Sequence, residues 1–362
     1  MSRPTCATIH LHALRHNLSR VRALAPHSKV MAVVKADGYG HGLERVARAL
    51  AGADAFGVAA LADAERIRAA GLSNRVVLLS GFDDVSDLPL LRSLDVDTVV
   101  HHESQLAMLE AEAERAPTDA KPIRVWLKLD TGMHRLGFPA ERAHAIHARL
   151  AALRNVAPEI ALMTHFASSD AFDGAQTHAQ IALFDKMADV GTVRSLANSA
   201  GVLGWPAAHA DWGRAGGALY GLSVVEGKTG ADFGLRPAMT LATRLIAINR
   251  VARGEPVGYS ATWRCPEDMD IGVAAIGYGD GYPRSVPSGT PVLVGGVRVP
   301  LVGRVSMDLM TLDLRGAPDA RVGDPVVLWG PELPAEEIAA AAGTISYELT
   351  CSITRRVRFT ED

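Results

Sequence analysis

Short apolar runs recur through the first two thirds of the chain, with amphipathic segments between several of them. Helix-like periodicity covers residues 61–70, 103–115, 140–153 and 175–188. The alternation predicts parallel strands joined by crossover helices, and eight such units over roughly 200–250 residues are typical of a (β/α)8 TIM-type barrel. The eight predicted strands lie near residues 30–35, 55–58, 76–79, 96–100, 123–129, 160–164, 193–197 and 218–222.

The pattern changes after about residue 232, where alternating, β-branched segments follow glycine and proline turns. Such segments are typical of an all-β domain, and a short helix is predicted inside it at 335–342. We therefore predict an α/β protein with a barrel over residues 1–232 and a C-terminal β domain over 233–362. The predicted strands of the second domain include 271–276, 291–294, 297–302, 325–329 and 352–359.

The barrel prediction places the active site, because the functional residues of such barrels lie at the C-terminal ends of the strands. Arg214, Gly216 and Gly217 come just before the eighth run. Most of the candidate residues should therefore converge on one face of the barrel. Other polar residues end, or closely follow, the first, fifth, sixth and seventh runs: Lys35, Arg135, His165, Asn198 and Ser199.

Lys35 lies in the segment V-V-K-A-D-G-Y-G-H-G at 33–42 and follows an apolar strand. Desolvation there would lower the lysine pKa, and a neutral amine is what condensation with an aldehyde requires. Glycines at 38, 40 and 42 let the backbone approach a bulky anionic group closely. The alternative is a lysine that extends its charged end into water from the strand end.

The segment around Lys35 resembles the cofactor-lysine motif of the alanine racemases, which use pyridoxal phosphate (PLP). Further segments resemble that family in the same order along nearly the whole chain, so the resemblance is specific. They are K-L-D-T-G-M-H-R-L-G (128–137), T-H-F-A (164–167), N-S-A (198–200), G-R-A-G-G-A-L-Y-G (213–221), V-G-Y-S-A-T-W (257–263), I-G-Y-G-D-G-Y (276–282), V-G-R-V-S-M-D (302–308) and Y-E-L-T-C (347–351).

The resemblance implies interconversion of L- and D-alanine by two bases on opposite faces of the substrate. PLP delocalises the charge left when the α-proton is removed. Lys35 would hold the cofactor at rest and become the base for the D-isomer after transimination, and Tyr259 would be the base for the L-isomer. His165, at the cofactor site, matches a histidine close to this tyrosine and to the arginine matching Arg214, and this positively charged neighbourhood would stabilise the phenolate.

The resemblance also assigns residues around the cofactor. Arg214 would face the pyridine nitrogen, and a guanidinium cannot readily give up a proton, so that nitrogen should stay unprotonated. Arg135 would contact the phenolic oxygen and the substrate carboxylate. The other matches are Asn198 in the cofactor site, Tyr39, Ser199, Gly216 and Gly217 at the phosphate, and Tyr278 and the Met307 backbone along the substrate pocket.

Two positions stay open. The family often carries a phosphate-contacting tyrosine four residues after the cysteine matching Cys351, but this chain has Arg355, so Arg355 and Tyr347 are both candidates. Lys128 matches a lysine that is carbamylated in some family members. It is either carbamylated, to hold Arg135, or unmodified and paired with Asp130 or solvent.

Composition excludes several classes of function and indicates a location in the cell. The formal net charge of -3 gives no basic surface for nucleic acid, and no apolar run is long enough to span a membrane. Residues 1–5 lack the apolar core of a signal peptide, and three widely spaced cysteines suit reduced thiols, so a cytoplasmic location is expected. No metal site is expected, since the histidines at 10, 12 and 16 have no supporting cluster.

The resemblance further implies a head-to-tail homodimer in which the β domain of one chain caps the barrel of the other. It also implies that residues 1–9 contribute a strand to the β domain. Alternative functions are a broad-specificity or serine racemase of the same family, or a non-catalytic PLP carrier, which would need Lys35 but not Tyr259. The activity would serve either the supply of D-alanine for the cell wall or alanine catabolism.

Overall fold

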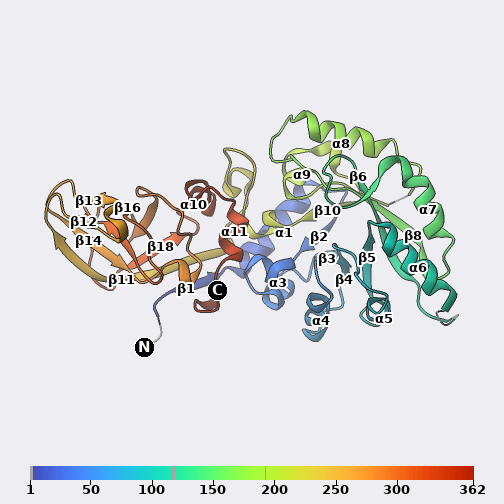
Figure 1. The fold of residues 1–362 in the computed structure, drawn as a ribbon, viewed down its shortest axis with the longest axis horizontal. Helices are drawn as coiled ribbons and strands as arrows, with labels where there is room; N and C mark the ends of the chain where they lie inside the picture. The colour runs from blue at the N-terminus through green and yellow to red at the C-terminus, as the bar shows by residue number, and fades with distance from the viewer. Residues whose placement is uncertain (1–2, 116, 118, 192) are drawn as a thin grey trace.

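The computed structural model describes residues 3–115, 117, 119–191 and 193–362. In the described residues, two large sheets form the two ends of an elongated molecule (Figure 1). The parallel sheet belongs to the first part of the chain and the mainly antiparallel sheet to the second. The predicted fold class, a barrel followed by an all-β domain, is confirmed.

The parallel sheet curls into a barrel-like ring in which β10 pairs with β2, so that the last strand lies beside the first. Between β9 and β10 the ring is joined by a backbone hydrogen bond of 2.9 Å from Arg214 N to Ala197 O. The strands of the ring are β2 (Lys29–Val33), β3 (Ala55–Val58), β4 (Arg75–Leu78), β5 (Val96–Val100), β6 (Ile123–Asp130), β8 (Val156–Met163), β9 (Val193–Ser195) and β10 (Trp212–Ala215). The two-residue strand β7 (Phe138–Pro139) pairs with β6.

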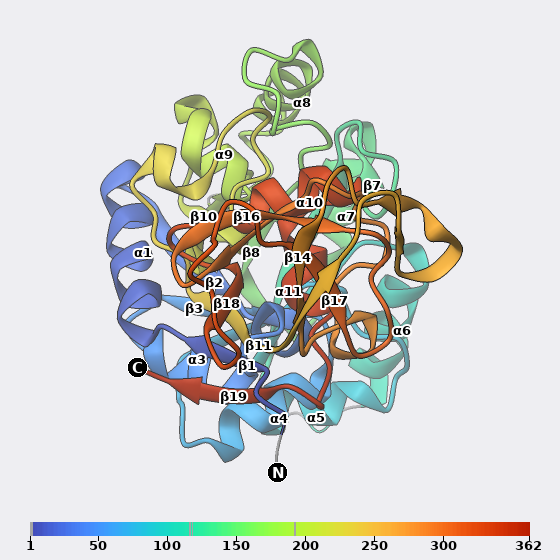
Figure 2. The same ribbon diagram turned by 90° about the vertical axis from the view of Figure 1, so that its left-hand side faces the viewer.

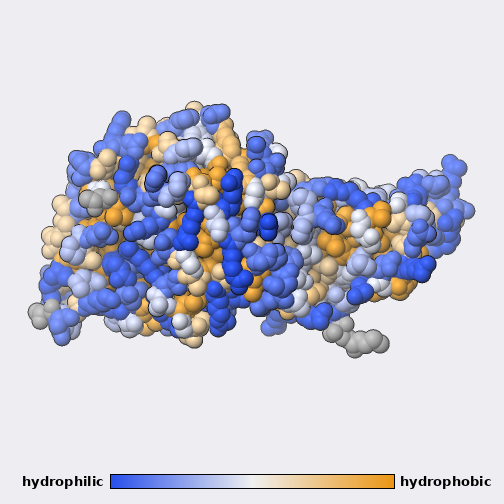
Figure 3. All heavy atoms as spheres, turned by 180° about the vertical axis from the view of Figure 1, so that it is seen from behind, coloured by the Kyte–Doolittle hydropathy of each residue, from blue (hydrophilic) through white to orange (hydrophobic). Residues whose placement is uncertain are grey.

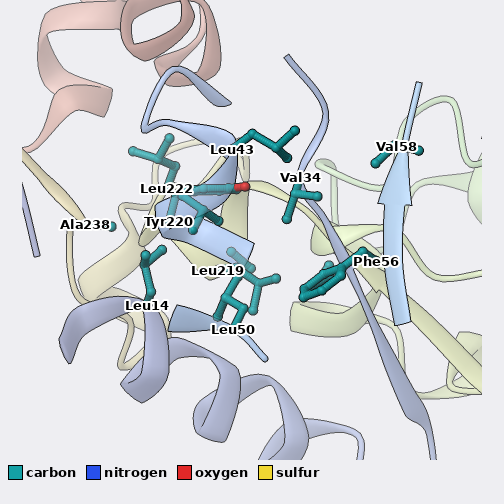
Figure 4. Packing of buried hydrophobic residues seen from close by; sticks show 14 of the residues in the cluster. Leu14, Val34, Leu43, Leu50, Phe56, Val58, Leu219, Tyr220, Leu222 and Ala238 are labelled. Carbon is teal, nitrogen blue, oxygen red and sulfur yellow. The ribbon is translucent and has the colours of Figure 1, made fainter. Parts of the chain in front are cut away.

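Helices cover the outside of this ring (Figures 1 and 2). Their apolar faces pack on the strands: Figure 4 shows Leu14 of the first helix in the same cluster as Phe56, Leu219 and Tyr220. The helices are α1 (Leu11–Leu24), α3 (Leu43–Ala49), α4 (Leu61–Ala69), α5 (Asp87–Ser93), α6 (Glu103–Arg115), α7 (Ala143–Ala151), α8 (Ala175–Asp185) and α9 (Ser199–Gly204).

The N-terminal end of the ring is filled by side chains. Asp97, which has no exposed surface, accepts hydrogen bonds from Arg75 Nε at 2.7 Å and from the Trp126 indole at 2.9 Å. The Arg75 guanidinium also lies 5.6 Å from the ring centres of Trp126 and Trp212. Because this end is packed, access to the interior of the ring is from the C-terminal ends of the strands.

The prediction of the eighth strand at 218–222 is wrong. The strand is Trp212–Ala215, and Arg214 therefore lies within it rather than before it. The apolar run forms a 3₁₀ turn, Gly217–Tyr220, which is buried against α1. A short buried run of this kind has no periodicity that separates a strand from a helical turn.

The second sheet has the order β14-β17-β16-β15-β18-β11-β1-β19, and β14 also pairs with β11, which closes six of these strands into a ring. Strand β1 pairs with β11 and with β19, so residues 6–9 join this sheet; residues 1–2 of the predicted segment lie outside the described residues. Its strands are β1 (Cys6–Ile9), β11 (Met239–Val251), β14 (Met269–Ala274), β15 (Pro291–Val294), β16 (Val297–Val302), β17 (Met310–Asp313), β18 (Pro325–Trp329) and β19 (Arg358–Glu361).

The second part also contains short elements outside this sheet. Strands β12 (Pro256–Val257) and β13 (Trp263–Arg264) form a separate hairpin, and α10 (Ala335–Ala342) is the predicted helix. The predicted strand at 352–359 is wrong over most of its length, because α11 (Ser346–Cys351) ends at its border and β19 begins only at Arg358.

Candidate functional site

A cavity of about 620 Å³ opens at the C-terminal ends of the barrel strands. Pockets of this size suit a small cofactor together with a small substrate. The cavity also reaches α11, where Tyr347, Glu348 and Cys351 line it. The predicted residues that line it are Lys35, Tyr39, Lys128, Arg135, His165, Asn198, Ser199, Arg214, Gly216 and Gly217.

Lys35 lies just after β2, which ends at Val33, and begins the short turn α2 (Lys35–Tyr39). Ala36, Asp37 and Tyr39 have φ angles of 53°, 53° and 52°, so the chain makes a left-handed turn here. This conformation costs about 1–2 kcal/mol for each residue that has a Cβ. The turn is held because Asp37 accepts hydrogen bonds from Leu43 N at 3.1 Å and from Arg66 Nη2 at 2.7 Å.

The amine of Lys35 faces a cationic surrounding. Loss of hydration inside the cavity lowers the Lys35 pKa below its ordinary value, and the positive charges of Arg135 and Arg214 lower it further. A lysine with a lowered pKa is neutral in a larger fraction of molecules at neutral pH. Its position and charge state therefore suit both covalent attachment of an aldehyde and proton transfer.

Arg214 is fully fixed at the base of the cavity. Its guanidinium donates to Ser195 Oγ at 2.6 Å, to Thr164 O at 2.6 Å and to Leu196 O at 3.1 Å, and none of the ion pairs among the described residues involves it. Burial lowers the Arg214 pKa to about 10, so the side chain remains charged at neutral pH.

His165 lies beside this guanidinium, with Nδ1 3.4 Å from Arg214 Nη2. Burial lowers the His165 pKa well below its ordinary value, and the charge of Arg214 lowers it further. The imidazole is therefore neutral. A neutral ring can accept a hydrogen bond from Arg214 at Nδ1 while its other nitrogen remains a donor.

One supporting residue was not predicted from the sequence. Gln180 of α8 is buried, donates to His165 O at 3.0 Å and accepts from Ala167 N at 2.9 Å, so it fixes the peptide that carries His165. The sequence carries no clear signal for Gln180, because the buried face of α8 mixes Thr177 and Gln180 with Ile181 and Phe184 and is not a continuous apolar stripe.

Two tyrosines and two glycines shape the end of the cavity near Ser199. A Cβ on Gly216 would lie 2.4 Å from Tyr39 Oη, and a Cβ on Gly217 would lie 2.0 Å from Tyr347 Cε1, so only glycine leaves room for these rings. Ser199 Oγ accepts from Gly216 N at 2.8 Å. Burial raises the pKa of Tyr39 and Tyr347, which keeps both phenols as neutral hydrogen-bond donors.

The remaining predicted residues near this end of the cavity have different positions. Asn198 caps α9, since its Oδ1 accepts from Gly201 N at 2.9 Å, and the same oxygen accepts from Ser169 Oγ at 2.9 Å. Of the two open candidates, Tyr347 lines the cavity, whereas Arg355 is exposed and does not line it.

Lys128 is 6 % exposed and lies near Arg214, Arg135 and Lys35. Burial, together with the positive charges of these three side chains, lowers its pKa to about 8. Asp130 acts in the opposite direction, but its carboxylate accepts from the backbone of residues 132–134 and from His134 and makes no ion pair with Lys128 among the described residues. Lys128 is therefore a buried amine among like charges.

Three predicted residues do not reach the cavity. Tyr259, Tyr278 and Met307 all lie in the second part of the chain, with exposed fractions of 67 %, 39 % and 53 %. The hairpin β12–β13, which flanks Tyr259, lies at the end of the molecule remote from the barrel (Figure 1). One chain alone therefore does not bring Tyr259 to Lys35.

The part of the chain that the structure describes has neither a membrane-spanning helix nor a metal centre. No helix there is long and apolar enough to cross a membrane. No group of three or more histidine, cysteine, aspartate or glutamate side chains among those residues is arranged to hold a metal ion. On the face shown in Figure 3, hydrophilic and hydrophobic side chains are intermixed over both parts of the molecule.

Comparison with known proteins finds one family over nearly the whole chain. Residues 9–224 match the family described as alanine racemase, N-terminal domain, and residues 238–360 match alanine racemase, C-terminal domain. An alanine racemase of Shewanella loihica is 55 % identical over 346 residues, covering 95 % of both chains. One of Nitrosococcus oceani is 54 % identical over 351 residues, covering 97 % of both.

Solved structures show the same similarity in three dimensions. The biosynthetic alanine racemase of Pseudomonas aeruginosa superposes with a TM-score of 0.95 at 45 % identity, covering 99 % of both chains. The alanine racemase of Acinetobacter baumannii gives a TM-score of 0.93 at 35 % identity, covering 99 % of this chain and 100 % of the other. With both domains matched in order and more than half of its residues shared with such relatives, this chain belongs to the alanine racemase family.

Proposed function

We propose that this chain is an isomerase that interconverts L- and D-alanine with pyridoxal phosphate, the cofactor on which the alanine racemase family depends. The observation that carries the proposal is the convergence of Lys35, Arg214 and the hydroxyl-and-glycine corner on one cavity at the barrel mouth. We propose that the barrel domain extends over residues 1–232 and the β domain over 233–362, with β1 (Cys6–Ile9) of the first segment joining the sheet of the β domain.

The cavity fits the cofactor. Its lining includes the cations Lys35, Lys128, Arg135 and Arg214 together with the carboxylate of Glu348, so the site favours an anion. The corner of Tyr39, Ser199, Tyr347, Gly216 and Gly217 would hold the phosphate through neutral donors. Arg214 would face the pyridine nitrogen, and Lys35 would hold the aldehyde carbon.

Different residues of the chain would carry out the proton transfer on the two faces of the substrate. The bound cofactor withdraws electrons from the substrate α-carbon and so makes its proton acidic. Once the amino group of the substrate has displaced Lys35 from the cofactor, the freed Lys35 Nζ would remove or return that proton on one face. Tyr259 Oη would do so on the other face, as a phenolate when it removes the proton and as a phenol when it returns it. Arg135 and the Met307 backbone orient the substrate carboxylate, and His165 would lie near Tyr259 and supply it with a neutral hydrogen-bond donor.

Because Tyr259 and Lys35 lie far apart in one chain, we propose a head-to-tail homodimer with shared sites. The β domain of each chain would cap the barrel cavity of the other, so that a two-fold dimer has two equivalent composite sites. The exposed side chains of Tyr259, Tyr278 and Met307 support this assembly, since they lie in the β domain and outside their own chain's cavity.

The free cysteines Cys6, Cys265 and Cys351 support a reducing, cytoplasmic location.

A panel of single L-amino acids, incubated with the protein and added PLP, tests the proposed function by polarimetry or chiral chromatography. Alanine should be inverted far faster than serine or bulkier amino acids. Comparable rates with serine and other side chains would favour the broad-specificity alternative, because pocket size alone separates the two. Absence of inversion with every amino acid, despite bound PLP, would favour the non-catalytic carrier.

We further propose that Lys128 is carbamylated. A pKa of about 8 makes the neutral amine available near neutral pH, and a carbamate anion would relieve the repulsion from Arg135 and Arg214. The nitrogen bonds to the carbon of CO₂ and its proton goes to solvent.

The carbamate should appear as a ¹³C resonance in protein equilibrated with ¹³C-bicarbonate. It should grow as the pH rises through 8, because only the neutral amine reacts, and it should be absent in Lys128→Ala. Lys186→Ala, which removes an exposed lysine, serves as the control and should keep the resonance. An identical spectrum for wild type and Lys128→Ala would show that Lys128 is unmodified.

A further inference from the structure

Two exposed side chains of the β domain are carried by loops that are joined to each other. Tyr278 lies on residues 277–281 and Met307 on residues 306–308. Tyr278 N donates to Ser306 O at 3.0 Å, and Gly279 N donates to Met307 O at 2.9 Å. We call these two loops together the Tyr278–Met307 platform.

Asp280 anchors the platform from within. It has no exposed surface, and its Oδ2 accepts from Gly277 N at 3.0 Å and from Arg3 Nη2 at 2.8 Å. Arg3 Nη2 also lies 2.9 Å from Asp308 O and 3.2 Å from Ala275 O. A residue that precedes β1 therefore connects both loops of the platform.

Arg356, near the other end of the chain, reaches the same two carboxylates. Its Nε lies 3.5 Å from Asp280 Oδ1, and its Nη2 donates to Asp308. The guanidinium lies over Gly279, where a Cβ would be only 2.3 Å from Arg356 Nη1. A glycine at position 279 is thus needed for Arg356 to approach.

These contacts differ from ordinary surface ion pairs, which contribute little because solvent screens them. Here one carboxylate is fully buried, and Arg3 also donates to backbone carbonyls of the loops. Removing a cation would leave the Asp280 charge buried with less compensation, and the two loops would lose their common anchor. The exposed side chains of Tyr278 and Met307 are therefore attached to a backbone that these contacts hold in one position.

We propose that Arg3 and Arg356 are positioning residues for substrate binding. Through Asp280 and Asp308 they hold the Met307 backbone and Tyr278 where the carboxylate of the amino-acid substrate is received at the cavity of a second chain. This inference rests on the proposed function, since it takes the racemase reaction and the shared site as given.

Arg3→Met and Arg356→Met in the PLP-loaded enzyme test the inference. We expect KM to rise roughly five- to tenfold for both alanine isomers while kcat stays within about twofold, because the weakened interaction with the substrate carboxylate is one that ground state and transition state share. Arg356→Lys should recover part of the increase. Arg298→Met, which removes an exposed pair with Glu337 in the same domain, is the matched control and should leave KM unchanged.

A second readout does not depend on turnover. Binding of acetate, a carboxylate without the amine, to the loaded enzyme should weaken by the same factor in calorimetry. A lower Tm with unchanged KM and acetate affinity would show a purely structural role and overturn the inference, as would a fall in kcat alone. If Arg3→Met does not fold, Arg356→Met decides, since its side chain is 37 % exposed. A wild-type enzyme without racemase activity would instead refute the proposed function, whatever the variants do.

Discussion

Lys35→Ala should abolish racemisation and the covalent attachment of the cofactor together. The loss of a general base typically costs about 100- to 10,000-fold, and loss of attachment adds to it, so a decrease of at least about 1,000-fold in kcat/KM is expected. The structural reason is the left-handed turn after β2, which places Lys35 in the cavity beside Arg135 and Arg214.

The measurement combines the visible absorption spectrum of the loaded protein with mass spectrometry of its peptides. Wild-type protein loaded with PLP should absorb in the visible, and borohydride should fix the cofactor mass to the peptide containing Lys35. Lys186→Ala should behave as wild type in both assays. Label on any other lysine, or retained activity in Lys35→Ala, would show that the assignment is wrong.

Tyr259→Phe should separate the two faces of the reaction. Exchange of the α-proton with solvent from L-alanine should fall by about 100- to 10,000-fold, whereas exchange from D-alanine should fall far less, because Lys35 still serves that face. Exchange followed by NMR in deuterated water measures each isomer separately. The substitution removes one exposed hydroxyl, and the fold should be unaffected.

Tyr282→Phe is a useful control for this experiment, since Tyr282 is a buried tyrosine of the same domain that does not line the barrel cavity. It should leave the ratio of the two exchange rates unchanged. Equal losses from both isomers in Tyr259→Phe would contradict a two-base mechanism.

The barrel could be predicted from the sequence because its strands are apolar runs separated by amphipathic helices. Strands at 55–58 and 96–100 match the prediction residue for residue. The eighth failed because its sequence, W-G-R-A, is not an apolar run, whereas the buried turn beside it is. Local hydrophobicity reports burial, and burial alone does not distinguish a strand from a turn.

The site could be predicted only as far as residues follow strand ends or match family motifs. The choice between Tyr347, on α11, and Arg355, which follows α11, depended on which part of this segment packs against the barrel, and packing between distant segments decides this. Gln180 and Arg3 were missed for the same reason: each acts through backbone atoms remote in sequence, and no local pattern records such contacts.

The shared site is the central claim, and complementation between two inactive variants tests it most directly. Lys35→Ala and Tyr259→Phe are each prepared, dissociated, mixed in equal amounts and allowed to reassociate. A mixed dimer has one site with both defects and one with neither, and about half of the dimers are mixed, so activity should return to about a quarter of wild type. If mixed dimers are shown to form and no activity returns, Lys35 and Tyr259 act within the same chain, and the shared-site account is wrong.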